Sequence, residues 1–156
     1  MDDLYYRASK ETARQLYSAE PQIHSPFFDG DIVLGPEGFR HLQVSTHSGA
    51  RTREEQMERF ALLPLAFQIL KTATTLQLYR KRPLKLYSKD ETRALNERKM
   101  VQWWCFQALF LKRARMVKVV VKKVGGGELH FWSVMEHKLD KWGEPKYLKG
   151  ADWTSN

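Results

Sequence analysis

Two groups of basic and polar residues carry the side chains that could do chemistry in this sequence. The first group consists of Arg40, His41, His47 and Arg51. The second follows much later in the chain and consists of Lys118, Lys122, Lys123, His130, Ser133 and His137. A histidine whose pKa is near neutrality can take a proton from a hydroxyl group, and a second group can protonate a leaving oxygen. Arginine or lysine neutralises the charge that grows on phosphorus. Metal-independent cleavage of RNA needs these residue types, because the RNA itself supplies the 2′-hydroxyl nucleophile.

The first group also has a structural interpretation. His41 lies between Phe39 and Leu42, which is compatible with a hydrogen-bonded histidine at a helix surface. His47 precedes a Ser-Gly pair in an expected loop, so packing explains it less well. Arg51 stands just before a helix cap, where an arginine has no special structural role and is equally compatible with a solvated charge.

The second group, except for His137, belongs to two β-branched or aromatic runs, residues 116–124 and 128–135, which three glycines separate. His137 follows the end of the second run. This pattern predicts a β-hairpin with a glycine-rich turn. Strict alternation would place Ser133 on an apolar face, as a candidate core residue, with Leu129, Phe131 and Met135. It would place His130 on the other face with Trp132 and Val134. The tryptophans fit a core better than base stacking, although Trp142 and Trp153 have polar neighbours.

Other kinds of chemistry have weaker support. The glycine run lacks the Lys-Ser/Thr pair and the helix of a phosphate-binding loop. The histidines show no metal-ligand spacing, and the single cysteine, Cys105, can form neither an intrachain disulfide nor a zinc-ligand set. We therefore expect no metal and no cofactor.

The charge of the chain is divided unevenly along its 156 residues. Its net charge is +8, but residues 1–70 carry seven Lys/Arg and ten Asp/Glu, whereas residues 71–149 carry nineteen and seven. Basic charge held in one half favours a polyanionic partner, nucleic acid ahead of a membrane, although a solubilising surface is also consistent with it. The acidic start and the lack of a long apolar run predict a cytoplasmic protein without a membrane segment.

Periodicity and turn signals predict an α+β domain with helices ahead of a roughly four-stranded antiparallel sheet. The expected helices cover residues 2–19, residues 36–44 and a segment capped by Thr52 and Glu55, which Pro64 should kink or split. The expected strands are residues 31–34, 76–79, 84–87 and 101–110 and the two arms of the hairpin, with residues 21–30 as a loop. The predicted organisation is an N-terminal helix and loop (residues 1–30), one α+β domain (residues 31–138) and a polar tail (residues 139–156).

The order of several segments resembles that of the phage-associated barnase–EndoU–colicin–RelE superfamily of ribonucleases, over roughly residues 31–138. The resemblance rests on Gly38-Phe39-Arg40-His41, Thr46-His47, Leu62-Leu63-Pro64-Leu65, the extended residues 76–80, Val117 to Lys122 and Phe131-Trp132-Ser133-Val134. It implies a helical part packed on a four-stranded antiparallel sheet whose exposed face holds a metal-independent, RNA-cleaving site. His41 and His47 would be its helix histidines and Ser133 its final-strand polar residue, with Arg51 added because it is close to His47.

Three hypotheses about function follow. The first is a metal-independent RNA endonuclease that acts through the 2′-hydroxyl, as a phage or mobile-element toxin or effector. Its catalytic residues would be His41, His47, Arg51 and Ser133. Lys118, Lys122, Lys123, His130 and His137 would bind the RNA. The second is a non-catalytic nucleic-acid-binding or mobile-element accessory protein. The third is an interaction module whose basic half binds an acidic partner, such as an inhibitor or immunity protein.

Overall fold

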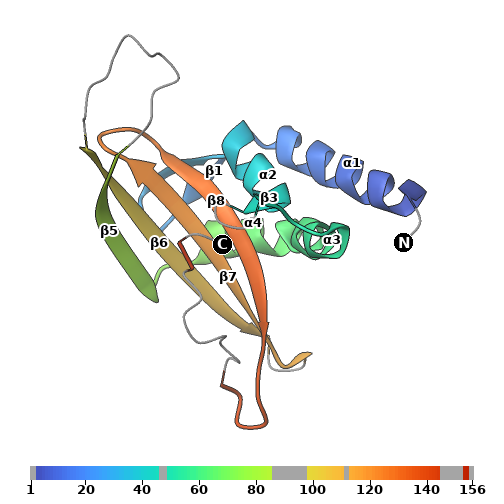
Figure 1. Cartoon of the computed structure of the whole chain (residues 1–156). Coiled ribbons are helices and arrows are strands. Elements are labelled where there is room, and N and C mark those ends of the chain that lie inside the picture. Colours follow the sequence, from blue (N-terminus) through green and yellow to red (C-terminus); the bar gives the residue numbers. More distant parts are fainter. Residues whose placement is uncertain (1–2, 46–48, 86–97, 111–112, 145–152, 155–156) are drawn as a thin grey trace.

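The computed structural model of the chain describes residues 3–45, 49–85, 98–110, 113–144 and 153–154. Within these residues lie four helices, α1 (Asp3–Ala19), α2 (Pro36–Gln43), α3 (Arg53–Ala61) and α4 (Leu63–Thr72). Eight strands accompany them: β1 (Gln22–Ser25), β2 (Gly30–Val33), β3 (Val44–Ser45), β4 (Gly49–Ala50), β5 (Leu78–Lys85), β6 (Arg98–Phe110), β7 (Arg115–Val124) and β8 (Leu129–Lys138) (Figure 1). The fold is therefore of the α+β class, as the sequence predicts.

Six of the strands form one mixed sheet in the order β1-β2-β8-β7-β6-β5. Strands β5 to β8 form the expected antiparallel meander, but the two separate strands expected over residues 76–79 and 84–87 are replaced by the single edge strand β5, which contains Pro83. Strand β1 pairs antiparallel with β2, and β2 runs parallel to β8. The expected roughly four-stranded antiparallel sheet thus describes only the meander, because β1 and β2 extend the sheet and introduce a parallel pair.

Strand β1 corrects the expectation of a loop over residues 21–30. Its Ile23 is buried and pairs with Ile32 of β2, while its Gln22 and His24 are exposed. One buried apolar residue close to Pro21 carries little strand signal in the sequence. The strand forms because its backbone pairs with β2, and not because of a local sequence pattern.

The helices begin where the sequence places their start signals. Thr52 caps α3 by accepting a hydrogen bond from the Glu55 backbone N–H, and the Glu55 carboxylate accepts from the Thr52 N–H. Pro36 occupies the first turn of α2, where its missing N–H is not needed. Pro64 separates α3 from α4 rather than bending one continuous helix.

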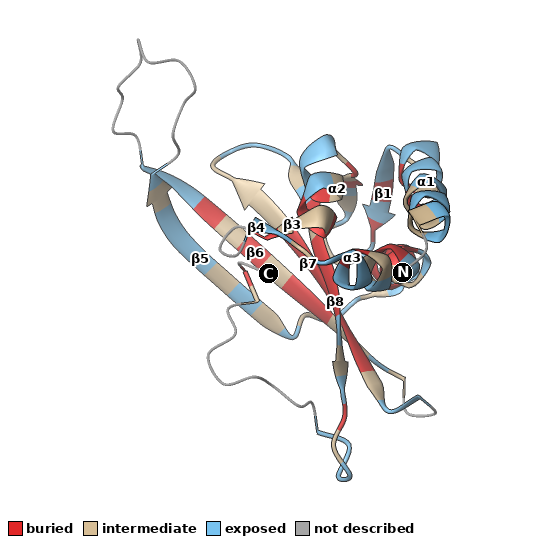
Figure 2. Cartoon of the chain, turned by 45° about the vertical axis from the view of Figure 1, so that its right-hand side comes forward, coloured by how far each residue is buried: buried red, intermediate tan, exposed pale blue. Residues whose placement is uncertain are grey.

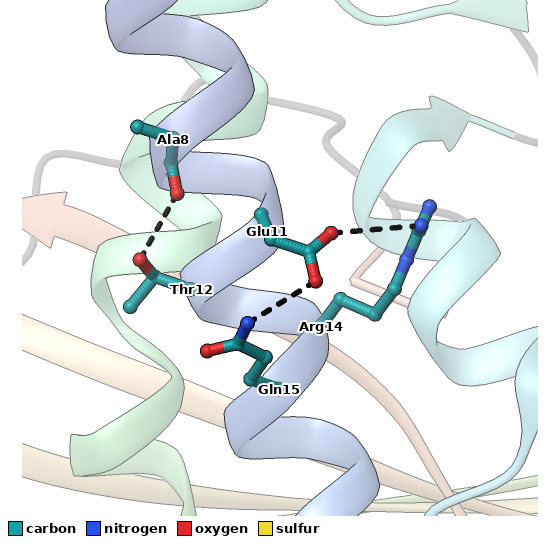
Figure 3. Close-up of polar contacts among 5 residues, drawn as sticks. All are labelled: Ala8, Glu11, Thr12, Arg14 and Gln15. Carbon is teal, nitrogen blue, oxygen red and sulfur yellow. Dashed lines mark hydrogen bonds and ion pairs between the residues drawn. The ribbon is translucent and has the colours of Figure 1, made fainter.

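Helix α1 packs one side on the core and turns the other to solvent (Figure 2). Its outward polar contacts are local: Thr12 donates to the Ala8 carbonyl oxygen at 2.9 Å, and Glu11 contacts Arg14 and Gln15 (Figure 3). Such pairs one helical turn apart add only tenths of a kcal/mol. None of the helices in the described ranges is long and apolar enough to cross a membrane.

The hairpin of β7 and β8 confirms the predicted glycine-rich turn, in which Gly125 has a positive φ of 55°. A bulge interrupts its register, because Val121 pairs with Phe131 whereas Val120 pairs with Ser133. Trp132 is the additional residue, so Phe131 and Ser133 lie on opposite faces of the sheet. The expectation that Phe131 and Ser133 share a face is therefore wrong. For the same reason His130 and Val134, which strict alternation would place together on the other face, lie on opposite faces.

The sheet has two differently covered faces. The helix face packs against α1, α3 and α4 through a large cluster that includes Phe106, Val119 and Phe131. The opposite face, called here the second face, carries a smaller cluster of Val101, Trp103, Cys105, Val120 and Met135. Trp132 and Trp153 pack against this smaller cluster.

Strand β2 pairs with β8 only at Leu129 and His130. Beyond these two residues, the outer edge of β8 is not paired with β2 and can be reached by side chains of the helices. Helices α2 and α3 gather beside this edge (Figure 1). Gly38 lets α2 approach closely, because a Cβ atom there would overlap the Phe131 carbonyl oxygen and the Tyr17 hydroxyl. This close approach brings side chains of both helices to the middle of β8.

Candidate functional site

Arg59 is the central side chain of the candidate site. It leaves α3 towards the open edge of β8, where its Nη1 donates to the Ser133 hydroxyl oxygen at 2.8 Å and to the Val134 carbonyl oxygen at 2.9 Å. Burial, followed by the positive charge of Arg51, lowers the pKa of Arg59 from 12.5 to about 10. The guanidinium therefore keeps its charge at neutral pH. Ser133 is completely buried beneath it.

Arg51 lies beside Arg59, at the start of α3. The small β3–β4 sheet returns the chain to α2, so that the Arg51 backbone N–H donates to the Gln43 carbonyl and its Nε to the His41 carbonyl at 3.4 Å. Burial lowers the pKa of this arginine, and Glu55 partly offsets the effect. Its Nη2 atom is buried and has no hydrogen-bond partner among the described residues.

His41 is buried rather than exposed on the helix surface, with 4% of its surface accessible. Its ring lies 4.2 Å from the Trp132 ring, centroid to centroid, at an interplanar angle of 30°. Burial lowers its pKa from 6.5 to about 3, and the charges of Arg51, Arg59 and Lys122 act in the same direction. Although the Trp132 backbone lies close enough to oppose this shift slightly, neither ring nitrogen makes a hydrogen bond of good geometry to the described residues.

At neutral pH His41 is consequently uncharged and cannot serve as a general acid. A pKa of about 3 also makes it a weak base. The other predicted histidine of this group, His47, lies outside the described residues. The first group therefore contributes Arg51 to the site and a neutral imidazole that packs against Trp132.

The second group contributes two lysines and a histidine from the second face. Burial lowers the pKa values of Lys118 and Lys122. Lys118 has only 4% of its surface exposed. Lys122 holds its Nζ 3.6 Å from the centroid of the Trp132 ring. Burial, then the charges of Lys118 and Arg59, lower the pKa of His137 below 6.5. Arg59 therefore lies close enough to His137 to influence its charge.

Of the other two predicted members of this group, Lys123 is turned away from the site and His130 lies at its border. Lys123 alternates to the helix face, opposite to Lys118 and Lys122. His130 is exposed at the start of β8, near Gly35, and pairs with Lys122 across the strands.

The cations of the site are poorly balanced by acids. In the described part of the chain, Arg51, Arg59 and Lys122 make no ion pair with a carboxylate. The carboxylates that influence their pKa values, Glu55 and Glu37 among them, do so from a distance. Buried cations normally have such partners. An excess of positive charge with unpaired N–H donors suits a bound anion.

Two narrow hollows adjoin Trp132 at this site. One, of about 200 Å³, is lined by His41 and Arg40 among others, and the second, of about 240 Å³, by Lys122 and His130 among others. Glu37 lines both. A larger hollow, of about 710 Å³, lies between α3–α4 and the ends of β6 to β8, with Leu65 and Phe110 in its wall. It contains none of the cations described above, so the candidate chemistry lies outside this larger hollow.

Arg59 and Trp132 are the two site residues that sequence reasoning missed. Arg59 follows the buried Gln56 by three residues and adjoins the buried Phe60, so helical spacing places it at the border of the packed face. This spacing was the available signal for Arg59. Nothing local marks the bulge that turns Trp132 to the second face. Among the described residues, no group of three or more His, Cys, Asp or Glu side chains could hold a metal ion.

Comparisons with known proteins identify no relative: no family model, no curated protein and no solved structure matches this chain. The functional argument therefore depends on the residues themselves.

Proposed function

We propose that the protein binds RNA on the second face of its sheet and cleaves it by metal-independent attack of a 2′-hydroxyl group. The observation that carries the proposal is the contact of Arg59 with Ser133, 2.8 Å long, beside Lys118 and His137 on the same face. A phosphate that enters this place would meet the Arg59 guanidinium, which makes no ion pair with a carboxylate among the described residues. Burial strengthens such electrostatic contacts.

Each residue has a distinct role in this proposal. Arg59 stabilises the charge that develops on the phosphorane, and Ser133 positions a phosphate oxygen by hydrogen bond. His137 is neutral at pH 7 because its pKa is lowered, so it can accept the proton of the 2′-hydroxyl. The Lys118 ammonium, whose pKa burial also lowers, donates a proton to the departing 5′-oxygen. The bond from O2′ to phosphorus forms as the bond from phosphorus to O5′ breaks, which gives a 2′,3′-cyclic phosphate and a 5′-hydroxyl.

This assignment keeps Ser133 from the first hypothesis, replaces Arg51 by its neighbour Arg59 as the cation that meets the phosphate, and moves the proton transfer from His41 to His137. The argument for the move is electrostatic. His41 has a pKa of about 3 and is enclosed by α2, Trp132 and three cations. His137 is only half-buried, and burial is the main cause that lowers the pKa of both histidines.

The test is incubation of the purified protein with total RNA in the presence of EDTA. Discrete fragments that the Arg59→Ala protein does not produce would support the proposal. Intact RNA at every protein concentration would contradict cleavage.

A second candidate function, RNA binding without cleavage, is favoured by one observation. Ser133 has no exposed surface and Lys118, the proposed acid, has only 4%, so the free protein does not present these two groups openly to a substrate. A protein that binds RNA in a salt-dependent manner and leaves it intact would support this candidate. The lysines and tryptophans of the second face would then bind the RNA on their own.

A further inference from the structure

Trp153 and Thr154 lie against the second face of the sheet, on the side away from the helices (Figure 1). The Trp153 side chain is half-buried against the cluster of Val101, Trp103 and Val120. Thr154 has only 6% of its surface exposed. These two residues thus cover part of the face on which we place RNA.

Arg80 of β5 contacts both Trp153 and Thr154. The Arg80 guanidinium lies 5.6 Å from the centroid of the Trp153 ring, and its Nη1 donates to the Thr154 hydroxyl oxygen at 3.1 Å. Arg80 pairs with Trp103 across the strands, and Trp103 pairs with Lys122. Lys122 in turn holds its Nζ 6.0 Å from the Trp103 ring. Trp103 therefore lies between two cations and belongs to the cluster against which Trp153 packs.

The chemistry of this contact is that of a nucleotide on a protein. Nucleobases stack on aromatic and guanidinium planes, and phosphate oxygens accept hydrogen bonds from arginine. Here a flat indole lies by Arg80 and a hydroxyl oxygen accepts from the same guanidinium. The Trp153 ring takes the position that a nucleobase would have beside Arg80, and the Thr154 hydroxyl oxygen accepts the hydrogen bond that a phosphate oxygen would accept.

We propose that Trp153 and Thr154 occupy a nucleotide subsite formed by Arg80 and Trp103, so that the tail competes with RNA for the second face. This inference rests on the proposed RNA binding and adds to it a defined subsite. Arg80 lies three strands from β8, about 14 Å at ordinary strand spacing. The subsite consequently takes a base that flanks the bond to be cleaved rather than the bond itself.

The experiment measures binding of a fluorescein-labelled 2′-O-methyl oligouridylate, which cannot be cleaved through its 2′-oxygen, by fluorescence anisotropy. Trp153→Ala removes the ring, and Thr154→Val removes the acceptor while keeping the shape of the side chain. Trp142→Ala is the matched control, because Trp142 is 75% exposed, its ring contacts the neighbouring Lys141, and its backbone hydrogen bond to Asp140 is kept in the alanine variant. Thermal unfolding establishes that each variant is folded.

A competing tail lowers the apparent affinity by the fraction of molecules whose site is open. We expect Trp153→Ala to bind roughly threefold to thirtyfold more tightly than wild type, if the tail is bound in about 70–97% of molecules. Thr154→Val should change affinity in the same direction and by less, and Trp142→Ala should leave it unchanged. Adding Arg80→Ala to Trp153→Ala should weaken binding again.

Each other outcome has a defined meaning. If wild type binds and neither tail variant binds more tightly than Trp142→Ala, the tail only packs on the sheet and the inference is wrong, while RNA binding stands. If no form binds the oligonucleotide, the inference and the proposed function both fail. If Trp153→Ala does not fold, Thr154→Val decides the question, because it removes one hydroxyl from the Arg80 contact.

Discussion

Arg59 leaves α3 and ends between the hydroxyl of Ser133 and the backbone carbonyl of Val134. It satisfies a carbonyl at the open edge of β8 and, in the proposed reaction, faces the phosphate. Removing a donor that stabilises developing charge slows reactions by about 10²–10³-fold. The Arg59 side chain thus has two roles: it satisfies a backbone carbonyl at the edge of β8, and it stabilises the charge of the proposed reaction.

We predict that Arg59→Ala lowers kcat for RNA cleavage by about 10²–10³-fold. It should also lower the free energy of unfolding by about 1–3 kcal/mol, since the Val134 carbonyl loses its donor. Single-turnover cleavage assays and urea unfolding measure the two effects. Arg14→Ala is the control, because Arg14 is an exposed arginine of α1. Full activity of Arg59→Ala would remove this residue from the site.

His41 gives a prediction about pH. Its pKa is about 3 in the folded protein and 6.5 in the unfolded chain, so the unfolded state binds more protons between these values. Its contribution is fully present above pH 6.5 and is lost as the pH falls. Between pH 7 and pH 5 this one residue should lower the free energy of unfolding by about 2 kcal/mol.

Urea unfolding of wild type and His41→Gln at pH 7 and pH 5 tests this prediction. The glutamine variant should lose less stability than wild type on acidification, because it has no titrating ring. The depressed pKa of His137 contributes equally to both proteins and cancels in the comparison. Equal losses in the two proteins would show that His41 is not buried in its neutral form.

At the scale of the elements, the position of α2 against β8 determines which side chains reach the site. Gly38 permits this contact, and His41 follows it by three residues on the same helix. A larger residue at position 38 would push α2 away from the Phe131 carbonyl. The burial of His41 against Trp132 depends on this packing.

We therefore expect Gly38→Ala to destabilise the protein by about 1–3 kcal/mol through overpacking, with a lower melting temperature. Gly126→Ala, in the hairpin turn, is the matched control, because an added Cβ there meets no atom within 4 Å among the described residues. Differential scanning calorimetry measures both variants. Identical melting temperatures would mean that α2 does not pack as closely on β8 as described.

Sequence patterns predict those elements whose signals are local. The capping box of Thr52 and Glu55 and the left-handed Gly125 turn are encoded within a few residues. Strand β1 is not, because Ile23 becomes a strand residue only through its pairing with β2. The bulge at Trp132 is a property of the register between two strands and changes the face of every residue beside it.

The candidate site follows the same division. Ser133 and Arg51 could be selected by residue type, and the structure places both next to Arg59. The role of Arg59 depends on contacts between α3 and a strand 74 residues later in the chain, which no local pattern encodes. The low pKa of His41 likewise results from burial and from cations on three separate segments.

For the whole molecule, the net charge of +8 and the uneven distribution of that charge predict salt-dependent binding of RNA. Each phosphate that the protein neutralises releases a counterion, so log affinity should fall linearly with log salt concentration. Anisotropy titrations over a series of salt concentrations measure the slope. Arg82 is exposed on the edge strand β5, so Arg82→Ala should reduce the slope of log affinity against log salt more than Arg7→Ala on α1. An affinity independent of salt would contradict the electrostatic account.

The most direct test of the central claim compares two labelled oligoribonucleotides in EDTA, identical except that one carries a single deoxyribose at the position of cleavage. We predict that the protein cleaves the all-ribose strand and leaves a 2′,3′-cyclic phosphate, which mass spectrometry identifies. The strand with the deoxyribose should stay intact at that position, because its nucleophile is missing. Cleavage of both strands, a requirement for a divalent metal, or no cleavage of either strand would contradict the account.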